Sequence, residues 1–272
     1  MKFITIFIIA FFSLTESNAG IVDTIIVRSN AMNKDIKCVV IKPDSYRKQK
    51  KMNFPVIYLL HGYSGNYANW IKQVPELKKH ADVFQLIIVC PDGDFSSWYI
   101  NSPVDSTLKY ETYISKEVPE AIDKLYRTVS NKKGRAITGL SMGGHGGLFL
   151  GFRHPDIFGA FGSMSGGVDL RPFPNNWQLA KKLGDTITNA ENWKTYSVIN
   201  VIENFQNNSS KIIIDCGTED FFYAVNKALH EKMLKLKIKH DYIERPGIHD
   251  WNYWTNAIKY QLLFFKNYFD SK

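Results

Sequence analysis

Short, unbroken runs of apolar residues recur along the chain and are the main guide to its fold. Runs of this length are typical of strands buried on both faces, as in a parallel sheet that is covered by helices. Two early runs, residues 21–27 and 36–41, also predict strands. The later runs that predict buried strands are residues 55–60, 86–90, 135–140 and 211–216.

Helical spacing of apolar residues follows between several of these runs. It is present in residues 221–236 and 252–269, and in residues 111–127, where Pro119 predicts a kink or a delayed start. Strand, loop and helix alternate in this way along the chain. The alternation predicts an α/β fold, with a mostly parallel central sheet and helices on both of its faces.

Residues 170–206 interrupt the alternation. The segment has two prolines near its start and a cluster of Asn and Trp residues, and we interpret it as an insertion over one edge of the sheet. No internal repeat, low-complexity tract or linker divides the chain. We therefore expect residues 20–272 to form one domain with a sizeable core.

The first 19 residues predict export. A positive start at Lys2 precedes an apolar run at residues 3–12, and small residues lead up to Ala19. This arrangement is typical of a signal peptide cleaved after Ala19, with Gly20 as the first residue of a secreted or periplasmic protein. The apolar run is too short to span about 30 Å of hydrocarbon, and a non-cleaved anchor is the alternative. No later stretch is long and apolar enough to cross a membrane.

Charge and cysteine content exclude further classes of protein. The net charge of +8 comes with scattered Lys residues, which usually form solvated faces, so we predict no nucleic-acid partner. The three cysteines, Cys38, Cys90 and Cys216, are odd in number and far apart, which argues against a disulfide framework and a metal cluster. Cys90 and Cys216 end apolar runs and are predicted core residues, although export leaves open that two of the three pair.

Turns that contain glycine follow four of the predicted strands. In an open parallel sheet, the binding crevice lies beyond the carboxyl ends of the strands. The turns therefore predict one functional site at that end of the sheet. They are residues 61–65, 91–94, 139–143 and 215–220.

The sharpest motif is Gly-Leu-Ser-Met-Gly at residues 139–143. It lies between a predicted strand and residues 146–153, which can form a helix. A Gly-x-Ser-x-Gly turn in this place holds the serine in a strained, exposed conformation, and its glycines let strand and helix approach closely. Ser141 is therefore the candidate nucleophile. A phosphate-binding turn is excluded because the Gly-Lys-Ser/Thr ending of a P-loop is missing.

A serine nucleophile needs an imidazole as its base, and the imidazole needs a carboxylate. In this fold the acid and then the histidine follow the serine along the chain. His249 is the candidate base because it lies in a loop between the predicted last strand and the last helix. The other downstream histidines are predicted to lie on helices, at a strand start or at a helix end. They are His145, His154, His230 and His240.

Asp220 is the candidate acid, with Asp215 and Glu219 as alternatives near the end of the same strand. Asp215 is still within or just leaving the strand, whereas the Gly-Thr pair that follows allows a turn that aims Asp220 towards His249. Asp250, beside the base, is predicted to cap the last helix.

Acyl transfer also needs hydrogen-bond donors for a tetrahedral oxyanion, usually two backbone N–H groups. Met142, which follows the nucleophile, is predicted to supply one of them. Tyr63, in the loop after the strand of residues 55–60, is the candidate for the other.

Aromatic residues are frequent near the predicted mouth of the site. Flat rings can hold a sugar or a cinnamoyl group, and packing of a lid is the alternative interpretation. Trp98, Tyr99 and Trp251 are the candidate substrate contacts, while Asp94 and Glu111 are candidates for bonding a polar substrate or for a structural role. The aromatic residues are Trp70, Trp98, Tyr99, Trp251 and Trp254.

The same motifs, in the same order, resemble the esterase D family of α/β-hydrolases. The family includes S-formylglutathione hydrolases, tributyrin esterases, feruloyl and acetylxylan esterases, and mycolyltransferases. The resemblance extends from residue 55 to the C-terminus. It rests on residues 59–65, 91–93, 97–99, 110–113 and 139–144, and on the turns with Asp220 and His249.

By this resemblance, Ser141, Asp220 and His249 would form the catalytic triad, and Tyr63 and Met142 would be the oxyanion donors. The hydrolases of the family use no metal or organic cofactor, and we expect none here. A signal peptide departs from the cytoplasmic location usual for S-formylglutathione hydrolases. It fits exported esterases that act on acyl groups linked to polysaccharides.

The leading hypothesis is a serine carboxylic-ester hydrolase that forms an acyl-enzyme. Its expected substrates are short-chain or aromatic acyl esters, either small molecules or acetyl and feruloyl groups on a polysaccharide. One alternative is an acyltransferase to a sugar or alcohol, and another is a thioesterase similar to S-formylglutathione hydrolase. A carbohydrate-binding relic without catalysis is disfavoured by the intact Ser, Asp and His set.

Overall fold

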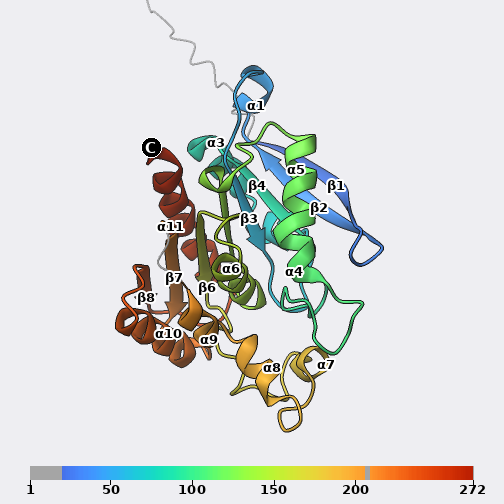
Figure 1. Cartoon of the computed structure of the whole chain (residues 1–272). Coiled ribbons are helices and arrows are strands. Elements are labelled where there is room, and N and C mark those ends of the chain that lie inside the picture. The colour runs from blue at the N-terminus through green and yellow to red at the C-terminus, as the bar shows by residue number, and fades with distance from the viewer. Residues whose placement is uncertain (1–19, 206–208, 272) are drawn as a thin grey trace, which may run out of the picture.

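Buried apolar strands form the centre of the molecule. The computed structural model describes residues 20–205 and 209–271, and the predicted signal peptide, residues 1–19, lies outside the described residues. The strands form one sheet in the order β1-β2-β4-β3-β5-β6-β7-β8 (Figure 1). Their bounds are Ile21–Ser29 (β1), Lys34–Lys42 (β2), Val56–Leu60 (β3), Ile87–Pro91 (β4), Arg135–Gly139 (β5), Ala160–Met164 (β6), Lys211–Gly217 (β7) and Asp241–Arg245 (β8).

The pairing of the strands confirms a mostly parallel sheet. Every pairing from β4 across to β8 is parallel, and only β2 runs antiparallel to its neighbours β1 and β4. Leu60 at the end of β3 is level with Gly139 at the end of β5. The turns that follow these two strands therefore emerge side by side at the carboxyl end of the sheet.

Strand β6 has no counterpart among the predicted strands. Its sequence, Ala-Phe-Gly-Ser-Met, contains a glycine and no β-branched residue, so its local preference for a strand is weak. Its neighbours β5 and β7 place it in the sheet. At Gly162 a Cβ atom would lie 2.3 Å from Oε1 of Gln261 and 2.8 Å from Cγ2 of Ile213, so the missing side chain makes room for both neighbours.

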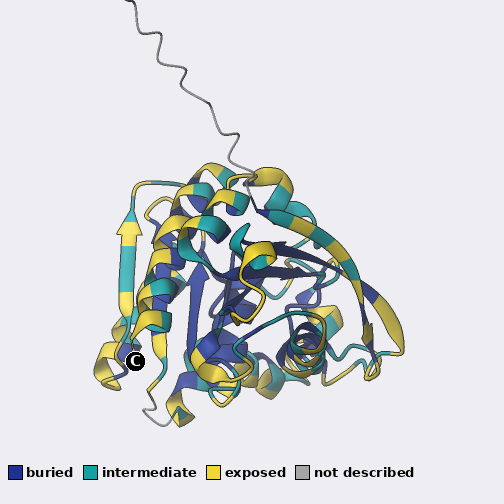
Figure 2. Ribbon diagram, turned by 90° about the horizontal axis from the view of Figure 1, so that it is seen from above, coloured by how far each residue is buried: buried dark blue, intermediate teal, exposed yellow. Residues whose placement is uncertain are grey.

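Helices cover both faces of the sheet, as the alternation of elements predicts. The central strands are buried between them, whereas the outer strands β1 and β8 are partly exposed (Figure 2). Helices α3 (Leu77–Phe84) and α11 (Trp251–Asp270) pack on one face. The other face carries α5 (Val118–Leu125), α6 (Met142–Arg153) and α10 (Tyr223–Lys235), and the short helices α1 (Ser45–Lys48) and α2 (Asn69–Gln73) lie in loops.

The predicted helix 111–127 is divided near Pro119. Helix α4 covers Tyr110–Thr112, a π-helical turn covers Tyr113–Glu117, and α5 begins at Val118 with the proline in its first turn. Proline has no N–H to donate to the carbonyl of the preceding turn. The wider π-helical turn precedes this proline, where the regular helical hydrogen bond is missing.

The segment that joins β6 to β7 holds α7 (Leu179–Leu183), α8 (Ala190–Thr195) and α9 (Val198–Val201). Because β6 and β7 are neighbours inside the sheet, the segment covers the carboxyl end of the sheet rather than an outer strand (Figure 1). It is held to the loop after β4. The Tyr196 hydroxyl donates to the Asn101 carbonyl at 2.9 Å, and the Ser102 hydroxyl donates to the Lys182 carbonyl at 2.7 Å.

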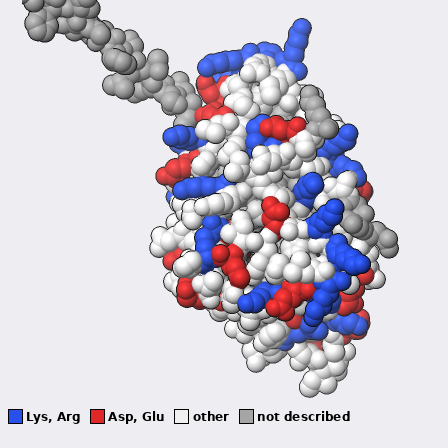
Figure 3. All heavy atoms as spheres, turned by 90° about the vertical axis from the view of Figure 1, so that its left-hand side faces the viewer, with Lys and Arg blue, Asp and Glu red and all other residues white. Residues whose placement is uncertain are grey.

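Three further features of the described residues concern the state of the cysteines, the distribution of surface charge and the length of the apolar helices. Cys38, Cys90 and Cys216 are all buried and free. On the face shown in Figure 3, Lys and Arg side chains lie among Asp and Glu side chains. Within residues 20–205 and 209–271, no helix has both the length and the apolar character that a membrane span requires.

Candidate active site

Ser141 lies at the tight turn between β5 and α6. Its backbone has φ 55° and ψ −117°, a strained conformation for a residue with a side chain. A Cβ atom at Gly143 would lie 2.5 Å from the Leu60 carbonyl oxygen, and one at Gly139 would lie 2.6 Å from the Gly143 carbonyl oxygen. The turn therefore requires glycine at residues 139 and 143, two positions before and after Ser141. It places the serine at the carboxyl end of the sheet.

Ser141, His249 and Asp220 form a hydrogen-bonded chain. Ser141 Oγ is 2.9 Å from His249 Nε2, and His249 Nδ1 is 2.8 Å from Asp220 Oδ2. Because a carboxylate only accepts hydrogen bonds, Nδ1 carries the ring proton. The lone pair of Nε2 then faces the serine hydroxyl, which donates to it. This arrangement allows the imidazole to take the hydroxyl proton as the oxygen attacks a substrate.

The Asp220 carboxyl is itself held in place. Its Oδ1 accepts a hydrogen bond of 2.8 Å from the backbone N–H of Phe222, while Oδ2 faces the histidine. The Asp220 side chain is fully buried, and that of His249 is 13% exposed. A buried carboxylate with a fixed second partner keeps both the tautomer and the orientation of the imidazole.

Two backbone N–H groups close to Ser141 have no backbone acceptor in the described part of the chain. Nearby amides are already paired: Ser64 donates to the Phe95 carbonyl at 2.8 Å, and Gly143 donates to the Leu140 carbonyl at 2.7 Å. Tyr63 and Met142 donate no backbone hydrogen bond to the described part of the chain. Met142 is the first residue of α6, so its N–H also carries the partial positive charge of a helix start.

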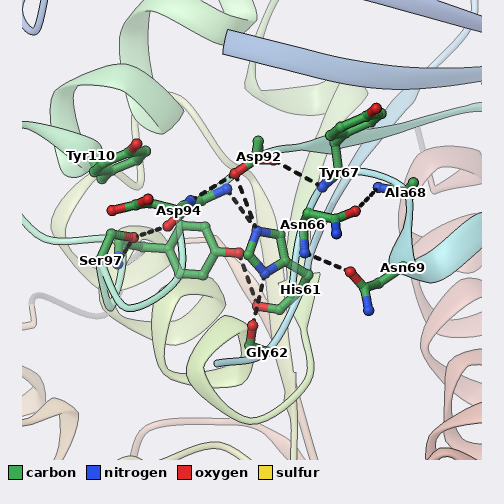
Figure 4. A network of polar contacts seen from close by, with 12 residues as sticks. His61, Gly62, Asn66, Tyr67, Ala68, Asn69, Asp92, Asp94, Ser97 and Tyr110 are labelled. Atoms are coloured by element: carbon green, nitrogen blue, oxygen red, sulfur yellow. Dashed lines mark hydrogen bonds and ion pairs between the residues drawn. The ribbon is translucent and has the colours of Figure 1, made fainter. Parts of the chain in front are cut away.

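A buried histidine holds the loop that contains Tyr63 (Figure 4). His61 Nδ1 donates to the Gly62 carbonyl at 2.8 Å, and His61 Nε2 accepts from the backbone N–H of Gly93 at 2.7 Å. Accepting at Nε2 requires a neutral ring, and burial lowers the pKa of His61 in agreement. The imidazole thus joins the loop after β3 to the loop after β4.

Aromatic rings enclose the other side of Ser141. The ring centre of Phe221 lies 4.1 Å from that of His249, and Trp177 is stacked on Phe221 at 5.7 Å and 20°. Trp254 meets the His249 ring edge-on at 4.8 Å. The cavity between these rings and the loop after β3 has a volume of about 260 Å³. It is lined by Gly62, Tyr63, Ser64, Gly65, Asn69, Leu140, Ser141, Trp177, Phe221, His249, Trp251 and Trp254.

Comparison with known proteins places the chain in a family. The esterase family model, whose description is "Putative esterase", matches residues 29–265. The chain belongs to this esterase family. It is an ester-hydrolysing enzyme with the α/β-hydrolase fold.

Individual relatives give the range of the similarity. An acetyl esterase of Caldicellulosiruptor saccharolyticus is 25% identical over 236 residues, which cover 80% of this chain and 86% of that protein. An esterase of Mycobacterium tuberculosis is 28% identical over 77% of this chain, which spans only 51% of that longer protein. The solved structure of a ferulic acid esterase superposes with a TM-score of 0.79 at 28% identity, covering 92% of this chain and 98% of the other.

The alternative acids of the esterase support the base-bearing loop instead of contacting His249. Asp215 is buried and bonds the Tyr253 hydroxyl and the Arg245 guanidinium. Burial raises the pKa of Asp215, although both partners act to lower it. Glu219 accepts from the backbone N–H of Gly247, two residues before the histidine.

Asp250 caps α11 in the esterase, as predicted. Its side chain accepts from the backbone N–H of Tyr253 at 2.9 Å. The residue beside the histidine therefore fixes where the last helix begins, and it leaves the contact with the imidazole to Asp220.

The side chains of four other histidines of the esterase bond to groups other than Ser141. His145 is buried, with ring nitrogens 3.0 Å from the Trp98 carbonyl and 2.9 Å from the Tyr196 carbonyl. Burial lowers the pKa of His145 to about 4, so the ring is neutral and donates to only one carbonyl at a time. The remaining contacts are His230 Nδ1 to His240 Nε2 at 2.8 Å and His154 Nε2 to Glu111 Oε1 at 2.9 Å.

Two expected substrate contacts do not reach the cavity. Tyr99 is fully buried and donates its hydroxyl to the His61 carbonyl at 2.9 Å. Its ring occupies space left by glycines: a Cβ at Gly93 would lie 2.2 Å from it, and one at Gly146 2.6 Å. Trp98 is also buried and donates its indole N–H to the Trp177 carbonyl at 3.3 Å. The two residues support the cavity wall from behind.

Among the polar candidates and the remaining tryptophans, some residues line the cavity and others make structural contacts outside it. Glu111 is buried against Arg153 and His154. Burial acts to raise the pKa of Glu111, but these two partners hold it below its ordinary value. The backbone N–H of Asp94 bonds the Asp92 side chain at 2.9 Å, which makes Asp94 part of the loop after β4. Trp251 and Trp254 line the cavity, and the buried Trp70 donates to the Leu60 carbonyl at 2.9 Å.

Sequence reasoning missed Trp177 and Phe221 as cavity residues. Phe221 directly follows Asp220 and is 53% exposed, and Trp177 belongs to the cluster of Asn and Trp in the insertion. The position of Phe221 beside a candidate acid was the available signal. Among the described residues, no group of three or more His, Cys, Asp or Glu side chains could hold a metal ion.

Proposed function

We propose that Ser141 is the nucleophile of this esterase, with His249 as its general base and Asp220 as the acid that orients the imidazole. The observation that carries the proposal is the chain of hydrogen bonds of 2.9 and 2.8 Å from Ser141 through His249 to Asp220. The unpaired N–H groups of Tyr63 and Met142 are the proposed donors to the oxyanion.

The reaction follows from these positions. Ser141 Oγ attacks the ester carbonyl while its proton moves to His249 Nε2, and the negative charge collects on the carbonyl oxygen. The imidazolium then protonates the leaving alcohol, which leaves an acyl-enzyme. A water molecule attacks that acyl group, again giving its proton to His249, and the free acid departs as Ser141 regains its hydrogen.

The proposed substrates are esters of short-chain or aromatic acids, including acyl groups on a polysaccharide. The cavity of about 260 Å³ is small and bounded by flat rings, which suits an acetyl group or one planar aromatic acid. Phe221 lines the cavity and Phe95 packs on Tyr63 of its lining; the two are 53% and 48% exposed, so they offer apolar faces to a sugar. The names of two relatives, an acetyl esterase and a ferulic acid esterase, support the same two acyl classes.

A panel of esters tests the mechanism and the acyl class together. The chain is assayed on nitrophenyl acetate and butyrate, methyl ferulate and acetylated xylan, each beside Ser141→Ala. We expect turnover that the variant loses, and the preferred ester identifies the acyl group. Activity of Ser141→Ala within tenfold of the wild type on every hydrolysed ester would contradict the mechanism. Added alcohols, followed by product analysis, separate hydrolysis from acyl transfer.

Export is part of the proposal, on the evidence of the sequence pattern of residues 1–19. The protein is expected in the periplasm or medium of a bacterial host, where polysaccharide esters are accessible. Cell fractionation with the full-length chain measures this. Recovery of the active enzyme only from the cytoplasm would contradict the location and leave the serine mechanism standing.

A further inference from the structure

Gly20, directly before β1, is built into the fold. It is buried, and its backbone nitrogen donates to Oδ2 of Asp82 at 2.8 Å. The other carboxylate oxygen of Asp82, on α3, accepts from the backbone N–H of Asp44, at the start of α1. One carboxylate therefore ties together the beginning of the first strand, α3 and the loop after β2.

The surroundings of Gly20 admit no side chain. A Cβ atom there would lie 2.8 Å from the carbonyl oxygen of Lys78 and 3.0 Å from that of Lys42. Backbone oxygens thus close in the α-carbon of Gly20, while its nitrogen faces the Asp82 carboxylate. The peptide nitrogen brings one hydrogen and no charge to the Asp82 carboxylate, whereas an α-ammonium brings a positive charge to the same place.

We propose that this place is a receiving site for the α-ammonium group that cleavage after Ala19 creates. The inference rests on the proposed export and cleavage. Hydrolysis of the Ala19–Gly20 peptide bond leaves a carboxylate on Ala19 and an amine on Gly20, which takes up a proton near neutral pH. The neutral N–H contact to Asp82 then becomes a charge-assisted hydrogen bond between an ammonium and a carboxylate.

The site links processing to stability. β1 is an outer strand of the sheet and pairs only with β2 among the described strands, so its start depends on local anchors. An ion pair at Gly20 fastens that start to α3. The uncleaved chain has the neutral contact alone, and the processed enzyme therefore has the firmer first strand.

A pair of chains that differ by one residue tests the receiving site. One begins at Gly20, released from a removable leader, and the other retains Ala19, which keeps the Gly20 amide and moves the charge outward. Each is made with Asp82 and with Asp82→Asn. We expect Asp82→Asn to lower Tm by about 4–6 °C in the Gly20 chain and by no more than about half of that in the Ala19 chain.

Asp44→Asn is the matched control. Asp44 is a nearby carboxylate in the loop after β2, and its side chain pairs with Lys48 instead of Gly20. Its small effect on Tm is expected to be equal in the two chains. Equal losses from Asp82→Asn in both chains would overturn the receiving site, whatever the outcome of the ester assays.

Mass spectrometry of the exported protein tests the processing step separately. An N-terminus at Gly20 is the expected result. A different N-terminus would overturn the assignment of Gly20 as the product of cleavage. Because the two-chain comparison uses a Gly20 terminus made in vitro, the origin of the terminus and its binding by Asp82 are tested independently.

Discussion

The two walls of the active-site cavity are built by different forces. On one side, the loops after β3 and β4 are joined by buried hydrogen bonds through His61, Gly93 and Tyr99. On the other side, Trp177 stacks on Phe221, whose ring contacts His249. The first wall carries a proposed oxyanion donor, and the second lies beside the proposed base and lines the cavity.

This difference indicates how each wall should respond to change. A buried hydrogen-bonding group that loses its partner lowers the stability of the folded protein by about 1–3 kcal/mol. A pair of packed rings contributes about 0.5–1.5 kcal/mol beyond its buried area, so replacing one ring by another apolar side chain costs only about that much. We therefore expect the polar wall to determine the rate of the chemical step and the aromatic wall to determine which ester is preferred.

Removal of the nucleophile sets the scale for comparing the walls. Ser141→Ala is expected to lower kcat/KM by at least about 10⁴-fold, because the remaining groups cannot form an acyl-enzyme. Ester hydrolysis under single-turnover conditions measures this. Ser64→Ala is the control because it removes another hydroxyl from the same cavity and is expected to stay within threefold or so of the wild type. Equal losses in both variants would contradict the role of Ser141.

Breaking the polar wall should have the next largest effect. His61→Ala removes the acceptor of the Gly93 N–H and frees the loop that carries Tyr63. We expect kcat to fall by roughly 5–150-fold with little change in KM, because the oxyanion exists only in the transition state. His61→Gln, which can accept the same hydrogen bond, should recover part of the rate. A loss confined to KM would contradict the comparison.

The polar wall should also make stability depend on pH. Burial lowers the pKa of His61, so the unfolded chain binds this proton more readily than the folded chain. The stability from the neutral ring is present above the unfolded pKa of about 6.5 and is lost as the pH falls below it, at no more than about 1.4 kcal/mol per pH unit. The facing groups are Asp92, whose Oδ1 lies 3.9 Å from Nε2, and Asp94.

Urea unfolding of the wild type and His61→Gln at pH 7 and pH 5 measures this dependence. The wild type is expected to lose more stability over that range than the variant, since glutamine does not titrate. Parallel losses in the two proteins would show that other groups account for the acid sensitivity.

The aromatic wall should give the smallest effect and a different signature. Phe221→Leu or Trp177→Leu is expected to lower kcat/KM for methyl ferulate by about 2–10-fold, mainly through KM, and to change nitrophenyl acetate less. Ile187→Ala is the control because Ile187 is 89% exposed in the same insertion and lies outside the cavity lining. Equal losses on both esters would remove the distinction between the two walls.

The sequence predicted those features that depend on residues close together along the chain, such as the turn that holds Ser141. The Gly-Leu-Ser-Met-Gly motif lies in a short strand–turn–helix segment, and its glycines are needed by contacts close along the chain or to the neighbouring strand. The apolar runs predicted the buried strands because a strand covered on both faces leaves no polar alternation. Strand β6 escaped this reasoning because its position depends on β5 and β7 rather than on its own residues.

The sequence by itself determined the order of the elements, the strained serine turn and a short list of acids and histidines. The tertiary structure decided which members of that list meet. Asp215, Glu219 and Asp220 lie within six residues, and only the fold directs Asp220 at His249 and the other two at the segment before it. It also buried Tyr99, because the room for its ring comes from the nearby Gly93 and from Gly146, which is far along the chain. Local patterns encode backbone shape, whereas the direction and neighbours of a side chain depend on segments that only folding brings together.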